Sequence, residues 1–192
     1  MGTSISQRSP NTNNWRAVAA IYRSEEIPVE RAVQEVWRAA TNQPLGDLKS
    51  ALAAPIIAQC LGITLEAKSP SEAYHTISKM VALKGLSTLA TDLAKRAAVN
   101  SFSKPGNRRL NFAESLFSEA INYLVSRDLP GYVGVGDRIS NVSDIIKFKK
   151  SVRQQVEITV NKYNVPVSVE KEYDSWKTYV GNVIDILVGK HK

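Results

Sequence analysis

The chain has 192 residues, of which 43% are hydrophobic and 22% are charged, and its formal net charge is +7. This size and composition are those of one globular domain that buries a core without metal or disulfide support. The single cysteine, Cys60, excludes an intrachain disulfide and a cysteine-based metal cluster, and it indicates a reducing compartment, the cytoplasm. The positive charge is compatible with nucleic acid or with an acidic protein as a partner, and it does not distinguish between them.

Apolar residues at helical spacing predict helices along the first third of the chain. The first is expected at 15–23 and the second at 27–40. A third is expected at 45–65, where Pro55 should kink or split it, because proline lacks a backbone donor and clashes with the preceding turn. The longest apolar run in this segment is short and contains Gln59, so we expect no membrane span.

Further start and stop signals divide the middle of the chain. The segment 69–72, SPSE, is the clearest helix start, because its serine can cap the helix and its glutamate can close a capping box. Gly85 should interrupt the helix that begins there, ahead of a second helical stretch at 86–97. A basic loop is expected at 103–110, and Asn111 repeats the capping spacing at the start of the next helix.

The last third contains one long predicted loop and two predicted helices. The loop is glycine-rich and spans 130–141; its GYVGVG lacks the GK[ST] ending of a P-loop, which favours a flexible loop over a phosphate site. Helical spacing returns at 142–163 and again at 169–187. The sequence therefore predicts an all-α fold: a single helical-bundle domain of about seven helices at 15–192, preceded by a flexible N-terminal arm at 1–14.

The residue types needed for catalysis are scarce. His75 and His191 are the only histidines, too few for a catalytic triad or a histidine-rich metal site. Cys60 lies in an apolar segment without a neighbouring cation, so we expect a buried core residue rather than a reactive thiol. The acidic residues at 170–174 suit the dipole of a helix N-terminus better than a ligand set. We therefore predict no enzyme activity, no metal and no cofactor.

Two groups of cations are candidate contacts to nucleic acid or to an acidic partner. Such cations neutralise phosphates, with an affinity that falls steeply with salt, whereas the alternative is a solvated helix surface. Apart from Phe148, no aromatic residues are interleaved with them, as a single-strand binder would need. The residues are Lys104, Arg108 and Arg109 in the basic loop, and Lys147, Lys149, Lys150 and Arg153 in the helix at 142–163.

The first fourteen residues, MGTSISQRSPNTNN, contain no acidic side chain and allow three interpretations. They can be an ordinary disordered terminus. Gly2 and Ser6 also fit the N-acylation pattern, which, with Arg8 as the nearby cation, would give a marginally membrane-bound adaptor. In the third interpretation, removal of Met1 exposes the amine of Gly2, which has no Cβ to block a narrow active site, on an arm that extends at most about 45 Å.

The opening Met1-Gly2-Thr3-Ser4, followed by Ser6, resembles the start of the B proteins of the bacterial Qat anti-phage defence system. The segment 139–163 is loosely similar to the C-terminal part of that family, whereas the glycine- and proline-rich stretch that follows the opening in the family is replaced here by SQRSPNTNNW.

This resemblance implies a non-catalytic, cytoplasmic protein whose processed Gly2 is joined to a 7-deazaguanine group by a QueC-like, ATP-dependent enzyme. It further implies that Thr3 and Ser4 are recognised by that enzyme. A basic helical nucleic-acid-binding protein and an N-acylated, membrane-associated adaptor remain the alternatives.

Overall fold

The computed structural model describes residues 13–41, 48–128, 134, 138–162, 165 and 173–190. No strand occurs within these ranges, and the predicted all-α fold is confirmed. The helices are α1 (Asn13–Arg23), α2 (Val29–Thr41), α3 (Leu48–Leu52), α4 (Pro55–Glu66), α5 (Pro70–Leu83), α6 (Leu89–Ser101), α7 (Arg108–Asp128), α8 (Val142–Val160) and α9 (Tyr173–Leu187).

The split predicted at Pro55 is confirmed, because the segment expected at 45–65 forms two helices, α3 and α4. The described residues therefore contain more helices than the seven or so that were predicted. Helix α1 begins at Asn13, so the last two residues of the predicted arm are helical, and the arm residues 1–12 lie outside the described residues. Of the predicted glycine-rich loop, the structure describes Gly134 and residues 138–141.

The capping predictions are confirmed at α5 with one change. The Ser69 hydroxyl accepts the Glu72 N–H at 3.1 Å, but the Glu72 carboxylate accepts the N–H of Lys68 at 2.8 Å instead of closing the box on Ser69. A complete capping box is found instead on α6, between Thr88 and Thr91, where threonine takes the place of the usual glutamate.

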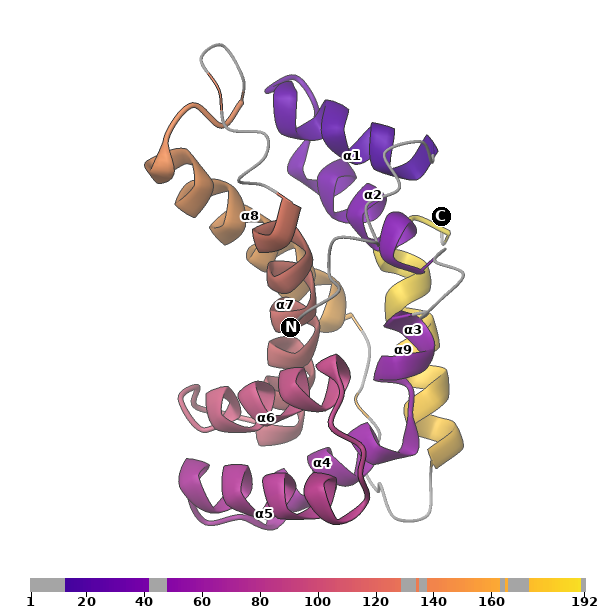
Figure 1. The fold of residues 1–192 in the computed structure, drawn as a ribbon, viewed down its shortest axis with the longest axis vertical. Coiled ribbons are helices and arrows are strands. Elements are labelled where there is room, and N and C mark those ends of the chain that lie inside the picture. Colours follow the sequence, from indigo (N-terminus) through magenta and orange to yellow (C-terminus); the bar gives the residue numbers. More distant parts are fainter. Residues whose placement is uncertain are drawn as a thin grey trace.

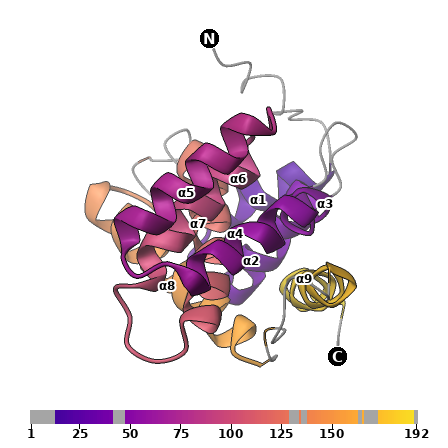
Figure 2. The same cartoon turned by 90° about the horizontal axis from the view of Figure 1, so that it is seen from below.

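Helix α7 lies at the centre of the arrangement. It packs against α6 on one side and α8 on another, and it also contacts α2 and α4. Helices α1 and α2 form one end of the molecule, and α4, α5 and α6 form the other (Figure 1). Helix α9 runs along the long axis and is seen end-on from below, whereas α4, α5 and α6 run across that axis (Figure 2).

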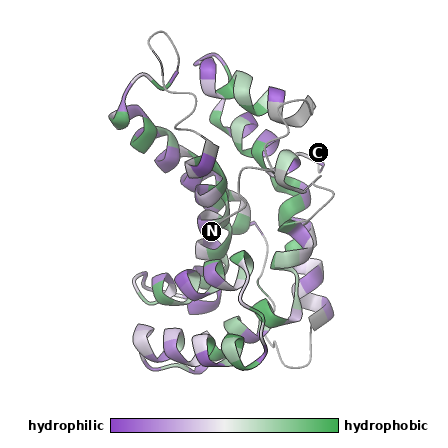
Figure 3. Ribbon diagram, in the orientation of Figure 1, coloured by the Kyte–Doolittle hydropathy of each residue, from purple (hydrophilic) through white to green (hydrophobic). Residues whose placement is uncertain are grey.

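The core is built from one face of each helix. Hydrophobic and hydrophilic residues accordingly alternate along the helices (Figure 3). A chain of aromatic rings connects α2, α7 and α9. Trp37 lies 6.1 Å from Phe117, Phe117 lies 6.4 Å from Tyr179, and Tyr179 lies 5.6 Å from Trp176, measured between ring centroids. All four residues are buried, so contacts between aromatic side chains hold α9 against the bundle.

One segment, Leu48–Glu66, is long and apolar enough to cross a membrane by length and composition alone. The break between α3 and α4 divides it at Pro55. Several of its apolar side chains, including Leu52, Ile57 and Leu61, are fully buried in the core, which is how the central helices of a globular protein pack.

Candidate functional site

Helix α7 carries a buried polar stripe in addition to its apolar faces. Asn111, Glu114, Ser115, Ser118 and Glu119 follow the spacing of neighbours on one helix face. The first four are between 3% and 8% exposed, although polar residues are normally at the surface. This stripe was not predicted from the sequence, although the spacing of its five residues by three or four positions is a signal that the sequence contains.

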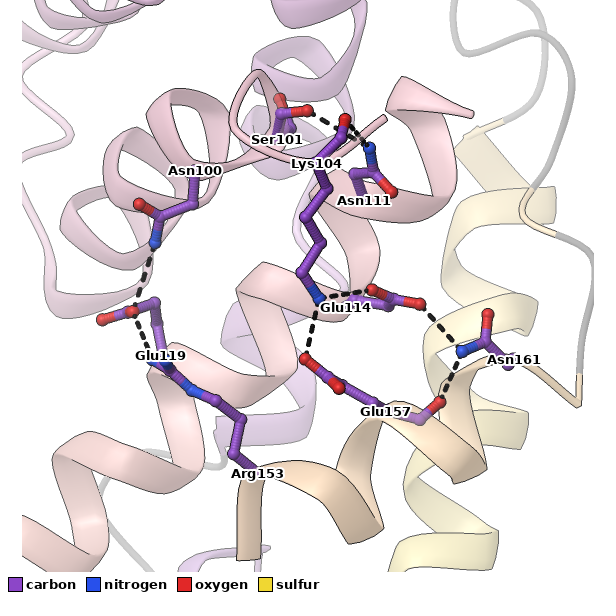
Figure 4. A network of polar contacts seen from close by, with 9 residues as sticks. All are labelled: Asn100, Ser101, Lys104, Asn111, Glu114, Glu119, Arg153, Glu157 and Asn161. Atoms are coloured by element: carbon purple, nitrogen blue, oxygen red, sulfur yellow. Dashed lines mark hydrogen bonds and ion pairs between the residues drawn. The ribbon is translucent and has the colours of Figure 1, made fainter. Parts of the chain in front are cut away.

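Two ion clusters occupy the region between α7 and α8 (Figure 4). In the first, the Lys104 ammonium donates to the Glu114 carboxylate at 2.9 Å and to the Glu157 carboxylate at 2.7 Å. The side-chain amide of Asn161 donates to the other oxygen of Glu114 at 2.8 Å. Lys104 therefore connects the α6–α7 loop to both helices.

Burial lowers the pKa of Lys104, but hydrogen bonds and charge interactions with Glu157 and Glu114 outweigh it and raise the pKa above its usual value. The ammonium is therefore firmly protonated at neutral pH. As a result, this predicted nucleic-acid contact is engaged within the protein.

The second cluster is centred on Glu119 of α7. Its carboxylate accepts from Arg153 of α8 at 3.2 Å and from the Asn100 amide of α6 at 3.3 Å, and Arg96 lies 3.9 Å away. The side chain of Glu119 is 15% exposed and that of Arg153 is 47% exposed. The structure thus brings Arg153 and Lys104, which the sequence placed in separate groups, to the same helix interface.

A cavity of about 210 Å³ lies between these two clusters. Helix α7 contributes Ser115, Ser118 and Glu119 to its wall, and α8 contributes Arg153 and Glu157. The end of α6 and the following loop complete the wall with further polar side chains, among them Lys104. All of the lining side chains within the described part of the chain are polar.

The prediction that Arg108 and Arg109 lie in a loop is wrong, because α7 begins at Arg108. The Asn107 side chain accepts the backbone N–H of Arg109 at 3.0 Å, so Asn107 caps the helix in place of Asn111. The Arg108 guanidinium donates to the carbonyl of Ala67 at 2.8 Å, at the end of α4, and lies 4.1 Å from the ring centroid of Phe102. Arg108 therefore links α7 to α4 and is not directed to a partner.

The remaining predicted cations are on α8. Lys147 is mostly exposed, and its ammonium lies 3.7 Å from the carboxylate of Asp144, one helical turn earlier. Exposed ion pairs of this kind contribute little stability. Lys150 is exposed and Lys149 is half-buried. These three lysines are the part of the predicted basic surface that faces outward on α8.

A second cavity, of about 400 Å³, lies where the end of the predicted glycine-rich loop meets the bundle. Arg138 lines it and donates to the carbonyls of Ser24 and Ile27 at 3.3 and 2.6 Å, while its guanidinium lies 4.9 Å from the Phe148 ring centroid. These contacts attach the described end of the loop to the α1–α2 connection.

Cys60 is fully buried, as predicted. Burial raises the pKa of its thiol to about 12, and the positive charge of Lys95 offsets this only in part. His75 is exposed on α5, with its ring 5.8 Å from that of Tyr74. No group of three or more potential metal ligands occurs among the described residues.

The residues predicted to act at the N-terminus, Gly2, Thr3 and Ser4, lie outside the described residues. Comparison of this chain with protein-family models, with curated proteins and with solved structures found no match.

Proposed function

We propose that this chain is a non-catalytic protein partner in an anti-phage defence module and presents its processed N-terminal Gly2 to a QueC-like, ATP-dependent enzyme. In this proposal Gly2 accepts a 7-deazaguanine group, and Thr3 and Ser4 supply backbone and hydroxyl contacts for recognition. The proposal rests on the opening MGTSIS and on the position of α1, whose first residue, Asn13, sets the length of chain available beyond the domain.

The anchoring of α1 is the structural observation that carries the proposal furthest. Val18, Ile21 and Tyr22 are buried, and the Tyr22 ring packs edge-on against Phe148 of α8 with 5.8 Å between centroids. Eleven residues from Gly2 to Thr12 precede the helix, and they can span at most about 40 Å. A domain that holds the base of such an arm can orient it toward an enzyme docked alongside.

The chemistry of the domain favours a structural role over a catalytic one. The thiol of Cys60 is buried, and its raised pKa opposes thiolate formation. Lys104 and Glu119 are each engaged by partners on neighbouring helices. Ion pairs of this kind hold helices together and do not leave an acid or a base poised for reaction.

The test is the intact mass of the native protein when it is co-expressed with its genomic neighbours. We expect an added nucleobase-type mass on the peptide that begins with Gly2, and loss of that adduct in Gly2→Ala, because the new Cβ enters a narrow active site. Ser6→Ala is the matched control, since it disrupts the acylation pattern and leaves Gly2 intact. Unmodified wild-type protein contradicts the proposal, and an acyl adduct that Ser6→Ala removes establishes the membrane-associated adaptor instead.

A second candidate function is nucleic-acid binding by the outward lysines of α8, favoured by the exposure of Lys147 and Lys150. With Lys104, Arg108 and Arg153 engaged internally, we expect about three phosphates to be neutralised, which corresponds to a slope of roughly −2.7 for log K against log salt on duplex DNA. The double variant Lys147→Gln/Lys150→Gln should make that slope less negative by about two units, because two fewer phosphates are neutralised. Salt titrations of DNA and RNA binding measure it, and weak binding that does not vary with salt excludes this function.

A further inference from the structure

One face of helix α8 is packed at one end and open to solvent at the other. Its residues recur at alternating spacings of four and three positions, which is the spacing of a helix face that docks on another helix. This face, called here the α8 seam, consists of Val142, Ile146, Lys149, Arg153, Val156 and Val160. Val156 and Val160 are fully buried, whereas Val142 is 71% and Ile146 is 64% exposed. The seam therefore continues beyond the helices that cover its C-terminal half.

The packed half of the seam shows how this face contacts a neighbouring helix. The two valines at its C-terminal end belong to the hydrophobic core. Arg153, one turn before them, pairs with Glu119 of α7 at 3.2 Å. Apolar contacts are thus combined with a cation–carboxylate pair across the helix interface. The open half repeats this composition, because its two apolar residues are followed by a cation, Lys149.

The lysines at the open half lack a carboxylate partner within the described part of the chain. Lys149 is half-buried on the seam, and Lys150 is exposed beside it. The described ion pairs of cations on α8 are made by Lys147 and Arg153 instead. The first turns of α8 also project from the bundle on the side away from α9 (Figure 1). This end of the seam therefore offers both apolar surface and positive charge to a partner.

The combination of apolar and cationic side chains distinguishes between classes of partner. A nucleic acid would use the lysines, but its phosphates gain nothing from two exposed aliphatic side chains. A lipid surface is entered by larger anchors such as Trp, Phe and Leu, whereas the exposed side chains here are the β-branched Val142 and Ile146. A helix that carries apolar residues and carboxylates on one face complements both features.

We propose that the open half of the α8 seam docks an acidic, amphipathic helix of another protein. Apolar side chains of that helix cover Val142 and Ile146, and its carboxylates pair with Lys149 and Lys150. Two turns of a helix bury less than the roughly 1,200 Å² of a stable complex, so this contact is transient. Its affinity falls as salt screens the charges.

The inference rests on the proposed function only in taking the partner to be encoded by a neighbouring gene. The two sites are also close enough for one partner. Tyr22 of α1 contacts Phe148 of α8, and about 14 Å of helix separate Tyr22 from Asn13. The arm that precedes Asn13 spans at most about 40 Å, which exceeds this distance. A protein docked on the seam can therefore also meet the arm.

Biolayer interferometry of the immobilised full-length chain with each purified product of the adjacent genes tests the proposal. We expect one of these proteins to bind with a micromolar Kd at about 50 mM salt. The double variant Val142→Ser/Ile146→Ser should weaken this binding at least about tenfold, because both apolar contacts are lost. Lys149→Gln/Lys150→Gln should also weaken it, with a smaller effect at about 300 mM salt. Ile158→Ser is the matched control and should bind like the wild type, since Ile158 is 56% exposed on α8 but lies off the seam.

The opposing results are equally specific. Absence of binding by every adjacent gene product, or an equal loss in Ile158→Ser, overturns the docking site. Binding of duplex DNA alone, unchanged in the apolar double variant, assigns the lysines to nucleic acid. Binding only to vesicles of phosphatidylcholine and phosphatidylserine assigns this surface to lipid. If Gly2 is unmodified but the double variant still loses its protein partner, only the proposed function fails. If Gly2 is modified and the double variant binds like the wild type, only this inference fails.

Discussion

Replacing Trp176 by alanine is expected to lower the free energy of unfolding by about 3–5 kcal/mol, a large part of the roughly 5–15 kcal/mol that stabilises a typical domain. Trp176 is 1% exposed, and its ring packs against Tyr179 and against Phe112 of α7. Truncation leaves a cavity between α9 and α7 that the surrounding helices can fill only partly.

The indole N–H of Trp176 adds a second contribution. It donates to the carbonyl of Leu52 at 3.0 Å, at the end of α3. Helix α3 stops just before Pro55, so this carbonyl lies at a helix end, where backbone acceptors lack partners within the helix. Trp176→Phe keeps part of the ring packing and removes this bond together with part of the ring, and should cost less than Trp176→Ala, about 2–3 kcal/mol.

Urea denaturation followed by far-UV circular dichroism measures both changes without relying on tryptophan fluorescence. Tyr123→Ala is the control, since Tyr123 is an aromatic residue of α7 that is 37% exposed, and it should change stability by less than about 1 kcal/mol. If Trp176→Ala costs no more than this control, α9 is not docked through its aromatic face.

The second large effect is expected for Glu114→Gln, which should destabilise the protein by about 1–3 kcal/mol. Replacing the carboxylate of residue 114 by an amide removes the negative charge that Lys104 and Asn161 both contact. The NH₂ group of the amide, which can only donate, then faces one of these two donors. This expected loss of stability is smaller than the loss for a fully buried ion pair, because the side chain of Lys104 is 43% exposed. Asp92→Asn is the control, because the Asp92 carboxylate that pairs with Lys95 at 2.9 Å is 55% exposed, and it should cost about 0.5 kcal/mol or less.

The effect of Glu114→Gln should depend on pH in a defined direction. The pKa of Lys104 is raised in the folded protein above its ordinary 10.5, so the folded state holds this proton more tightly than the unfolded chain. The stability that this provides is complete below about pH 10.5 and is lost as the pH rises through the raised value. The difference between wild type and Glu114→Gln should therefore narrow above that pH, and a constant difference would show that the charge of Lys104 is not involved.

Most of the helical framework could be predicted because its signals are local. The helical spacing at 169–187 comes from apolar residues that recur every three or four positions, and those at its centre, Trp176, Val180, Val183 and Leu187, are all buried in α9. Ser69 predicted the start of α5 because capping is an interaction over three residues. The start of α7 was placed at Asn111 instead of Asn107 because both positions offer an asparagine, and the sequence does not say which one caps.

The ion clusters were not predictable in the same way. Lys104 and Arg153 were interpreted as outward cations, since a charged residue in a helix or loop is normally solvated. Their partners are distant in the sequence: Glu157 is 53 positions from Lys104, and Glu119 is 34 positions from Arg153.

Sequence alone determined which segments are helical and which face of each is apolar, because backbone hydrogen bonding and capping act within a few residues. It also determined the chemistry of the N-terminal opening on which the proposed function rests. Tertiary structure alone decided which cations face inward and that a cavity forms between the two ion clusters, because both depend on how α6, α7 and α8 pack across large sequence separations.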